Sequence, residues 1–281
     1  MSTPVVLVTG ATGFLGPFVV AELRRVARVV QLRRRVGEAD SAVGDPGASD
    51  IVAADLTDLE ALDRAVSSSA PDFVLHMAAM SRMADCGGDP ERARATNSLP
   101  AGVIAGRCGK RSLFVSTDLV FDGRSAPYEP LDSVAPLSVY GQTKAEGEEL
   151  ALSKGGRVAR LPLLFGPDQA FRGATMMVRR AVEQQQTVTL YTNEYRTPLH
   201  ARDAARGLVE TLFAPDGARL VHLAGPERVS RWELGRRYCA LHQLPTTHVS
   251  AVECQDAARP RDVSLVSAWQ APRSLDDQLS G

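Results

Sequence analysis

The sequence contains very little lysine. Of its 32 basic residues only Lys110, Lys144 and Lys154 are lysines, and all the others are arginines. The 33 acidic residues leave a formal net charge of −1, and the only dense basic block is the arginine run at 33–35. This balance argues against a protein that binds nucleic acid or a membrane surface through its charge. A lysine in such a chain therefore needs a chemical reason.

Cysteine and long apolar runs are also scarce. The four cysteines, at 86, 108, 239 and 254, form no C-x-x-C pair, so we expect no metal site and interpret them as reduced thiols. No window approaches the roughly 20 apolar residues that span a bilayer, and the apolar N-terminus lacks the cationic start of a signal peptide. These features predict a cytoplasmic protein with no membrane contact. Hydrophobic residues make up 44% of the 281 residues, enough for one or two cores.

Short β-branched runs alternate with helical patterns over the first 165 residues. This rhythm predicts an α/β protein with a Rossmann-type, doubly wound parallel sheet. The predicted strands cover 5–8, 29–32, 51–54, 73–76, 113–116 and 158–161. The predicted helices cover 14–25, 59–66, 91–108 and 139–153, with Asp58 and Asp89 as helix-start signals.

The pattern loosens after residue 165. Helices are expected over 176–184, 204–213 and 232–242, with short strands near 188–190 and 220–223. We therefore predict a dinucleotide-binding domain over 1–165. Residues 166–281 would form mainly a smaller, discontinuous substrate-binding region, with part of the chain returning to the main domain.

A glycine-rich turn follows the first predicted strand and opens the first predicted helix. Its G-x-x-G-x-x-G spacing allows a tight turn and close backbone approach, and the helix N-terminus offers unpaired N–H groups to a pyrophosphate. The same spacing also occurs in purely structural turns, but this strand-turn-helix context favours a nucleotide site. The residues predicted to hold the cofactor here are Gly10, Thr12, Gly13, Phe14, Leu15 and Gly16.

The end of the second strand indicates which cofactor is bound. An acidic residue there would accept hydrogen bonds from the ribose of NAD, but this chain has Arg33 and Arg34, whose guanidinium groups suit the 2′-phosphate of NADP. The alternative is a solvated charge run. Asp55, after the third strand, could accept a hydrogen bond from the adenine amino group or could simply be a helix-start aspartate.

Tyr140 and Lys144 lie four residues apart on a predicted helix, and hence on one face of it. An ammonium near a phenol lowers the pKa of the phenol, which would make Tyr140 a usable acid or base near neutral pH. Thr117, at the carboxyl end of the fifth predicted strand, could hold a carbonyl oxygen there. These three residues form the predicted catalytic set.

Several motifs together resemble the extended short-chain dehydrogenase/reductases, in the branch that is similar to dTDP-4-dehydrorhamnose reductase. They cover 9–16, 76–79, 116–123, Tyr140 with Lys144, and 160–166, and the resemblance extends through 221–225 and 259–262. This branch also includes the regulatory subunit of methionine adenosyltransferase. The resemblance implies that Leu56, Ala78, Ala79, Tyr140 and Lys144 contact the cofactor.

The resemblance implies an NADPH-dependent ketoreductase. Hydride would pass from NADPH to a keto carbon, Tyr140 would donate a proton to the alkoxide, Thr117 would orient the carbonyl, and Lys144 would bind the nicotinamide ribose. The substrate would be a small molecule, a nucleotide-linked keto-sugar or a similar polar ketone. Its predicted contacts are Asp118, Ser81, Arg82, Arg196 and Arg259. Arg196 and Arg259 match the diphosphate arginines of epimerases, although a structural role for either is at least as well supported.

Two positions depart from the relatives. Leu119 stands where dehydratases carry a glutamate base, which disfavours dehydration, and Leu163 stands where rhamnose-forming reductases carry a sugar-binding tryptophan. The alternatives are therefore a non-catalytic NADP-binding regulatory protein or a sugar-nucleotide epimerase. The helices over 91–108 and 139–153 resemble the pair of helices that forms a dimer interface in this family, so a homodimer is expected. Asn97 is expected on a helix surface, with support of the cofactor as the alternative, and His76 is expected to be a packing residue.

Overall fold

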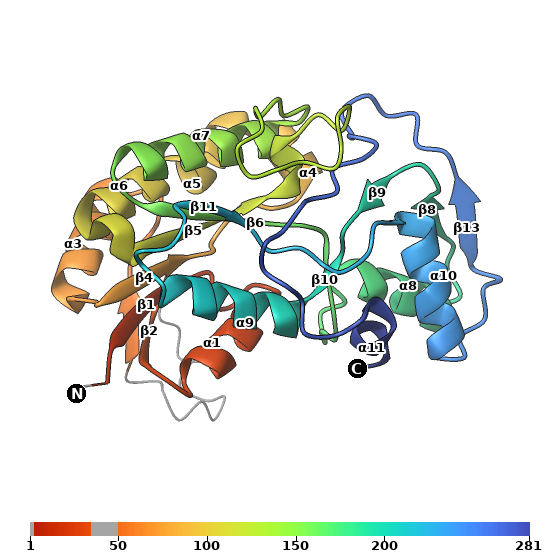
Figure 1. The fold of residues 1–281 in the computed structure, drawn as a ribbon, viewed down its shortest axis with the longest axis horizontal. Helices are drawn as coiled ribbons and strands as arrows, with labels where there is room; N and C mark the ends of the chain where they lie inside the picture. The colour runs from red at the N-terminus through yellow and green to blue at the C-terminus, as the bar shows by residue number, and fades with distance from the viewer. Residues whose placement is uncertain (1–2, 35–49) are drawn as a thin grey trace.

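The computed structural model describes residues 3–34 and 50–281. A parallel sheet of seven strands runs through it in the order β11-β6-β5-β4-β1-β2-β3 (Figure 1). The order reverses between β1 and β4, which is the point where doubly wound sheets bind their ligands. The strands of this sheet are β1 (Val5–Thr9), β2 (Arg28–Arg33), β3 (Ile51–Ala53), β4 (Phe73–His76), β5 (Ser112–Thr117), β6 (Arg157–Leu161) and β11 (Leu220–His222).

Helices cover both faces of the sheet. In Figure 1, α1 and α9 lie on one side of it, and α5, α6 and α7 lie on the other. Apolar side chains of α1 and α9 share one core with the sheet, and those of α3 and α6 share another. The helices of these layers are α1 (Gly16–Leu23), α3 (Leu59–Ser69), α4 (Met83–Gly88), α5 (Pro90–Asn97), α6 (Leu99–Cys108), α7 (Val139–Ser153) and α9 (Ala201–Leu212).

The remaining elements pack around a separate apolar cluster at one end of the sheet (Figure 1). Here β13 pairs with β8, β12 with β9, and β10 with β7, each as a two-stranded sheet. The elements are β7 (Leu164–Phe165), α8 (Ala174–Glu183), β8 (Val188–Tyr191), β9 (Tyr195–Arg196), β10 (Leu199–His200), β12 (Val229–Ser230), α10 (Arg231–Leu241), β13 (Val249–Val252) and α11 (Leu275–Ser280).

Two sequence expectations about these elements are corrected. The single helix expected over 91–108 is two helices that meet at Ser98, because Pro100 has no backbone N–H to continue the first one. The first helix begins at Gly16 rather than residue 14, because the glycine turn extends to that residue. The strand expected near 220–223 is present as β11 and joins the main sheet, where Leu220 pairs with Val158 of β6. The boundary between the two predicted domains remains a prediction.

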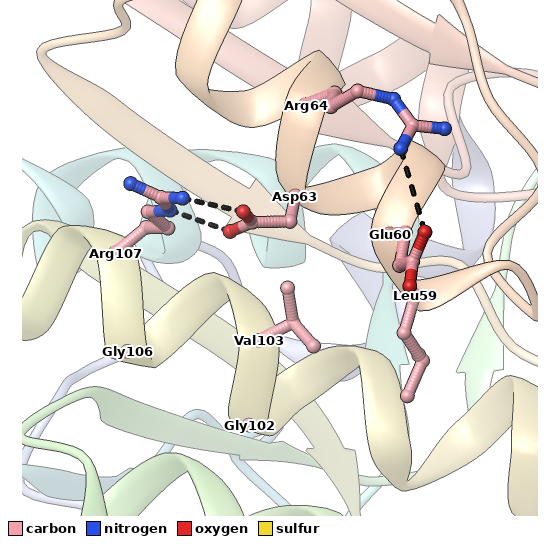
Figure 2. Close-up of a pocket in the computed structure, with 8 residues that line it drawn as sticks. All are labelled: Leu59, Glu60, Asp63, Arg64, Gly102, Val103, Gly106 and Arg107. Atoms are coloured by element: carbon pink, nitrogen blue, oxygen red, sulfur yellow. Dashed lines mark hydrogen bonds and ion pairs between the residues drawn. The ribbon is translucent and has the colours of Figure 1, made fainter.

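A hollow of about 590 Å³ lies between α3 and α6 (Figure 2). Asp63 and Arg107 form a two-pronged ion pair across it, and Gly102, Val103 and Gly106 line the α6 side. The hollow shares no lining residue with the glycine turn or with α7. The ion pair therefore ties two outer helices together away from the predicted catalytic residues.

Candidate active site

The glycine turn has the backbone geometry that a phosphate cradle needs. Gly10 has φ +76°, and a Cβ there would lie 2.7 Å from the Ala78 nitrogen. At Gly16 a Cβ would lie 2.0 Å from the Ala11 carbonyl oxygen. Leu15 occupies the N-cap of α1, and its side chain cannot accept a hydrogen bond from the first amides of the helix. The Gly16 N–H donates to the Gly13 carbonyl at 3.2 Å and Pro17 has no N–H, so the turn itself leaves the N–H groups of Phe14 and Leu15 for an anion, and these fit a pyrophosphate.

A cavity of about 890 Å³ lies beside this turn, over the carboxyl ends of β1, β2 and β3. Its lining contains both sequence-predicted and unpredicted residues. The predicted ones are Gly10, Thr12, Arg33, Arg34, Asp55, Leu56, Ala78 and Ala79. The unpredicted ones include Met80, Asp85, Asp89, Arg92 and Thr96, which follow β4 and begin α5. Gly13, Phe14, Leu15 and Gly16 do not line the cavity, and neither do Tyr140 and Lys144.

The two arginines of the cavity are placed differently. Arg33 donates from Nε and Nη2 to the Gln31 side chain at 3.2 and 2.8 Å, which fixes its guanidinium on the sheet. Arg34 is exposed and lines the cavity, and its charge contributes to lowering the pKa of Asp55. Arg35, the last arginine of the run, lies outside the described residues. A positive charge therefore stands where the sequence predicts the 2′-phosphate.

Asp55 is held in a local turn. Its Oδ1 accepts from the Thr57 backbone N–H at 2.9 Å and from the Thr57 hydroxyl at 2.8 Å, and these bonds hold the pKa of the carboxyl below its ordinary value. The cap of α3 is Asp58, which accepts from the Ala61 N–H. Asp55 is therefore not the helix-start residue, and it faces the cavity as a carboxylate.

Thr117 is the last residue of β5 and is 7% exposed. Its hydroxyl donates to Asp118 Oδ1 at 3.1 Å and accepts from the Leu119 N–H at 3.2 Å. Asp118 is buried, and burial raises the pKa of its carboxyl to about 6, against the opposing effect of Arg196. The threonine hydroxyl is thus oriented by its neighbours at the carboxyl edge of the sheet.

Helix α7 brings Tyr140 next to Thr117 because Gly141 allows a close approach. A Cβ at Gly141 would lie 2.3 Å from the Leu119 carbonyl oxygen, so no other residue fits there without displacing α7. Ser138 caps this end of the helix by accepting from the Gly141 N–H at 3.2 Å. Tyr140, the residue before Gly141, interacts through its side chain with Thr117, while the catalytic role of the two residues remains a prediction.

Lys144 is almost completely buried, with 1% of its surface exposed. Its Nζ donates to the Val115 carbonyl at 2.6 Å and lies 3.9 Å from the centre of the Phe114 ring. Burial lowers the pKa of Lys144 to about 7, while the nearby charge of Glu148 acts in the opposite direction. A compact ammonium fits this space between a carbonyl and an aromatic face, and a planar guanidinium does not.

The expected effect of Lys144 on Tyr140 is corrected by the structure. Burial raises the pKa of the Tyr140 phenol well above its ordinary value, and the negative charge of Asp118 adds to the rise. The hydrogen-bonding influence of Thr117 opposes this rise only in part. The Lys144 ammonium donates instead to the Val115 carbonyl. Tyr140 is therefore a protonated phenol in the free protein.

Two neighbouring side chains support this arrangement. Asn97 is fully buried, contrary to the expected helix-surface position. Its side-chain amide accepts a hydrogen bond from the Met80 backbone N–H and donates to the Met80 carbonyl and to the Thr143 hydroxyl. It therefore connects α7 to the segment after β4. His76 is buried as expected, hydrogen-bonds Thr9 at 2.7 Å, and has its pKa lowered to about 3 by burial. His76 thus acts as a packing residue and not as a base.

The predicted substrate arginines lie in a cluster of buried charges. Arg196 contacts Asp118 at 3.3 Å and Glu194 at 3.1 Å, and Arg259 contacts Glu194 at 2.9 Å. Arg196 thus forms ion pairs with two buried carboxylates, which favours a structural role for this residue over substrate binding. The Arg259 side chain, in contrast, has 27% of its surface exposed. Its partner Glu194 was not predicted, because a single glutamate in an irregular segment carries no sequence signal.

Two further predicted contacts, Ser81 and Arg82, are exposed at the start of α4. The unpredicted Arg231, the first residue of α10, acts electrostatically on Asp118.

Among residues 3–34 and 50–281 no group of three or more possible metal ligands occurs. No helix in those same ranges is long and apolar enough to cross a membrane. All four cysteines are unpaired and buried.

A seven-stranded parallel sheet, a glycine cradle at its switch point, and Thr117, Tyr140 and Lys144 at its carboxyl edge define the extended short-chain dehydrogenase/reductase class. Within this class, residues 4–272 match the model of the RmlD substrate binding domain family. The chain belongs to that family.

Curated relatives fall into two kinds. The chain is 28% identical over 277 residues to the methionine adenosyltransferase 2 subunit beta of Pongo abelii, covering 92% of this chain and 79% of that protein. It is 30% identical to the probable low-salt glycan biosynthesis reductase Agl14 of Haloferax volcanii, covering 97% and 95%. The relatives thus include a subunit of another enzyme and a probable reductase.

Solved structures share the fold along the whole chain. A dTDP-4-dehydrorhamnose reductase from Bacillus anthracis, solved in complex with NADP, superposes with a TM-score of 0.84 at 18% identity, covering 100% of this chain and 97% of that chain. A hypothetical dTDP-4-dehydrorhamnose reductase from Sulfolobus tokodaii gives 0.80 at 28% identity, covering 96% and 98%. These matches agree with the parallel sheet and the predicted α/β class.

Proposed function

We propose that this protein is an NADPH-dependent ketoreductase that acts on a nucleotide-linked keto-sugar or a similar polar ketone. One observation carries the proposal: Gly141 lets α7 approach so closely that Tyr140 stands beside Thr117, at the carboxyl edge of the sheet that also carries the glycine cradle. One curated relative is a probable reductase, and one solved structure of the same fold is a reductase in complex with NADP. The name of that relative supports a sugar-nucleotide substrate.

The residues of the cradle and the cavity fit NADPH. Close backbone packing at Gly10 and Gly16 shapes a turn whose Phe14 and Leu15 N–H groups are left for the pyrophosphate, and Arg34 supplies a charge for the 2′-phosphate. When bound, NADPH supplies the hydride. Lys144 would donate to the nicotinamide ribose from its position on the buried side of α7, and Asp55 would accept from the adenine amino group.

The side chains at the carboxyl edge would handle the carbonyl and the proton. The Thr117 hydroxyl would orient the carbonyl oxygen, and the Tyr140 phenol would donate its proton to the alkoxide as it forms. The Tyr140 phenol holds this proton in the free protein, as a proton donor must. Asp118 would accept from a substrate hydroxyl, and the partly exposed Arg259 would face an anionic group of the substrate.

The two alternatives are less well supported by the same residues. An epimerase must also take a proton away, which a phenol with a raised pKa does poorly. A regulatory protein needs no aligned catalytic side chains, yet Thr117, Tyr140 and Lys144 are positioned together by Gly141 and by the contacts of Lys144. The similarity to the methionine adenosyltransferase 2 subunit beta is the observation that favours a regulatory function. The following experiment tests it.

The experiment is oxidation of NADPH against a panel of 4-keto nucleotide sugars, with NADH in parallel. We expect turnover with at least one compound and a preference for NADPH. If no compound is consumed and a partner enzyme co-purifies with the protein, the regulatory function is the correct one. Equal affinity for NADH and NADPH would contradict the cofactor assignment.

We further propose that the protein is a cytoplasmic homodimer formed through α5, α6 and α7. These helices lie side by side in the outer layer of one face (Figure 1). The four unpaired thiols fit a reducing compartment. A monomeric mass by light scattering at micromolar concentration would refute the dimer, and recovery outside the cytosolic fraction would refute the location.

A further inference from the structure

A short segment between β7 and α8 lies directly on the glycine turn. Gly173 has φ +88°, and a Cβ there would lie 2.8 Å from Cζ of Phe14, so the segment packs against the turn. Arg172 donates from Nη1 to the Thr12 carbonyl at 3.1 Å, across 160 residues of sequence. This contact joins the predicted substrate region to the phosphate cradle.

Asp168 fixes the direction of the Arg172 guanidinium. Its carboxylate accepts from Nε at 3.0 Å, from Nη2 at 2.7 Å and from the Arg172 backbone N–H at 2.8 Å. The pair keeps Arg172 charged, because the hydrogen bonds from Asp168 raise the pKa of the guanidinium. Asp168 holds the Arg172 guanidinium through Nε and Nη2, and the Thr12 carbonyl holds it through Nη1. The guanidinium is therefore fixed in one orientation beside the glycine turn.

The Arg172 guanidinium still has N–H donors that these contacts do not use. A guanidinium group carries five N–H bonds, and the contacts with Asp168 and Thr12 use three of them. The other two have no partner among the described residues, and 39% of the side-chain surface is exposed. Thr12 lies in the same turn as Phe14 and Leu15, whose backbone N–H groups would hold a pyrophosphate.

We propose that Arg172 is a binding residue for the pyrophosphate of the cofactor, and that Asp168 is its positioning residue. The two remaining N–H groups of Arg172 would donate to a phosphate oxygen that the Phe14 and Leu15 amides also hold. This assignment rests on the proposed function, because it presumes a dinucleotide in the cradle. It assigns separate phosphates to two arginines, the pyrophosphate to Arg172 and the 2′-phosphate to Arg34.

The test is calorimetric binding of two probes, NADP⁺ and adenosine 2′-monophosphate, which carries the 2′-phosphate but no pyrophosphate. For Arg172→Gln we expect NADP⁺ to bind about ten- to a hundredfold more weakly, while adenosine 2′-monophosphate binds as it does to the unchanged protein. Arg34→Gln should weaken both probes. Arg180→Gln, at an exposed position on α8, is the matched charge control and should change neither.

Two further measurements separate binding from general damage. Arg172→Gln should unfold at nearly the wild-type temperature, and its NADP⁺ affinity should depend less on salt. Unchanged NADP⁺ affinity, or equal weakening of both probes, would overturn the assignment while leaving the reductase proposal intact. Failure of the wild-type protein to bind NADP⁺ would overturn both.

Discussion

The ion pair between Glu148 and Arg160 should be the main attachment of the catalytic helix to the sheet. Arg160 of β6 donates to the two carboxylate oxygens of Glu148 at 2.9 and 2.7 Å, and the side chains are 3% and 5% exposed. Arg160 also donates to the Pro130 carbonyl and lies over the Phe121 ring. Glu148 is one helical turn beyond Lys144. A change at this pair therefore acts on the helix that carries the site.

We predict that Glu148→Gln destabilises the protein strongly. It leaves the Arg160 guanidinium buried without its charge partner, which typically costs about 3–5 kcal/mol. At roughly 2–4 °C per kcal/mol for a chain of this size, the unfolding midpoint should fall by roughly 6 °C or more. Replacing both residues by apolar ones, as in Glu148→Leu with Arg160→Met, should recover most of the loss because no charge then stays buried.

The assay is reversible thermal or urea unfolding of Glu148→Gln, of the single variants Glu148→Leu and Arg160→Met, and of the double variant that combines these two. Glu146→Gln is the matched control, because Glu146 pairs with Arg94 on the exposed side of the same helix and its loss should be barely measurable. A Glu148→Gln midpoint no lower than that of Glu146→Gln would refute the reasoning. So would a double variant as unstable as the sum of the single ones.

Three further outcomes follow from the site. Burial lowers the pKa of Lys144 to about 7 from its ordinary 10.5. Between these two pH values the unfolded chain binds one proton more than the folded protein, so the free energy of unfolding rises with pH. In urea unfolding, Lys144→Met should lose this rise between pH 7 and 9. Arg34→Gln should reduce the preference for NADPH over NADH by roughly ten- to a hundredfold, and an unchanged preference in a titration would exclude Arg34. Gly16→Ala should lose about 1–3 kcal/mol of stability together with NADPH affinity, because its Cβ would meet the Ala11 carbonyl; normal binding would contradict the cradle.

The elements that follow simple periodicity could be predicted from the sequence. Helix α7 has the predicted bounds, and Asp58 and Asp89 cap helices as expected. The two-residue strands β7, β9, β10 and β12 could not be predicted, because their stability comes from partners distant in the sequence. The break at Ser98 was missed because the apolar pattern continues through Pro100.

The candidate site was predictable where a motif places it and not where tertiary packing decides it. The spacing of Tyr140 and Lys144 put both side chains on one helical face, but the pKa of Tyr140 depends on burial and on Asp118, which no spacing encodes. Asn97 is buried because α7 covers it. Arg172 reaches the glycine turn through a contact 160 residues apart in the sequence, so only the structure could reveal it.

The central claim is that Tyr140 donates the proton in a reduction driven by NADPH. The most direct measurement is a single turnover of enzyme-bound NADPH with a 4-keto nucleotide sugar, in the wild-type protein and in Tyr140→Phe. We predict that the variant binds NADPH with unchanged affinity but oxidises it at least a hundredfold more slowly, within the usual range for a lost general acid. Full turnover by Tyr140→Phe with NADPH bound would contradict the account.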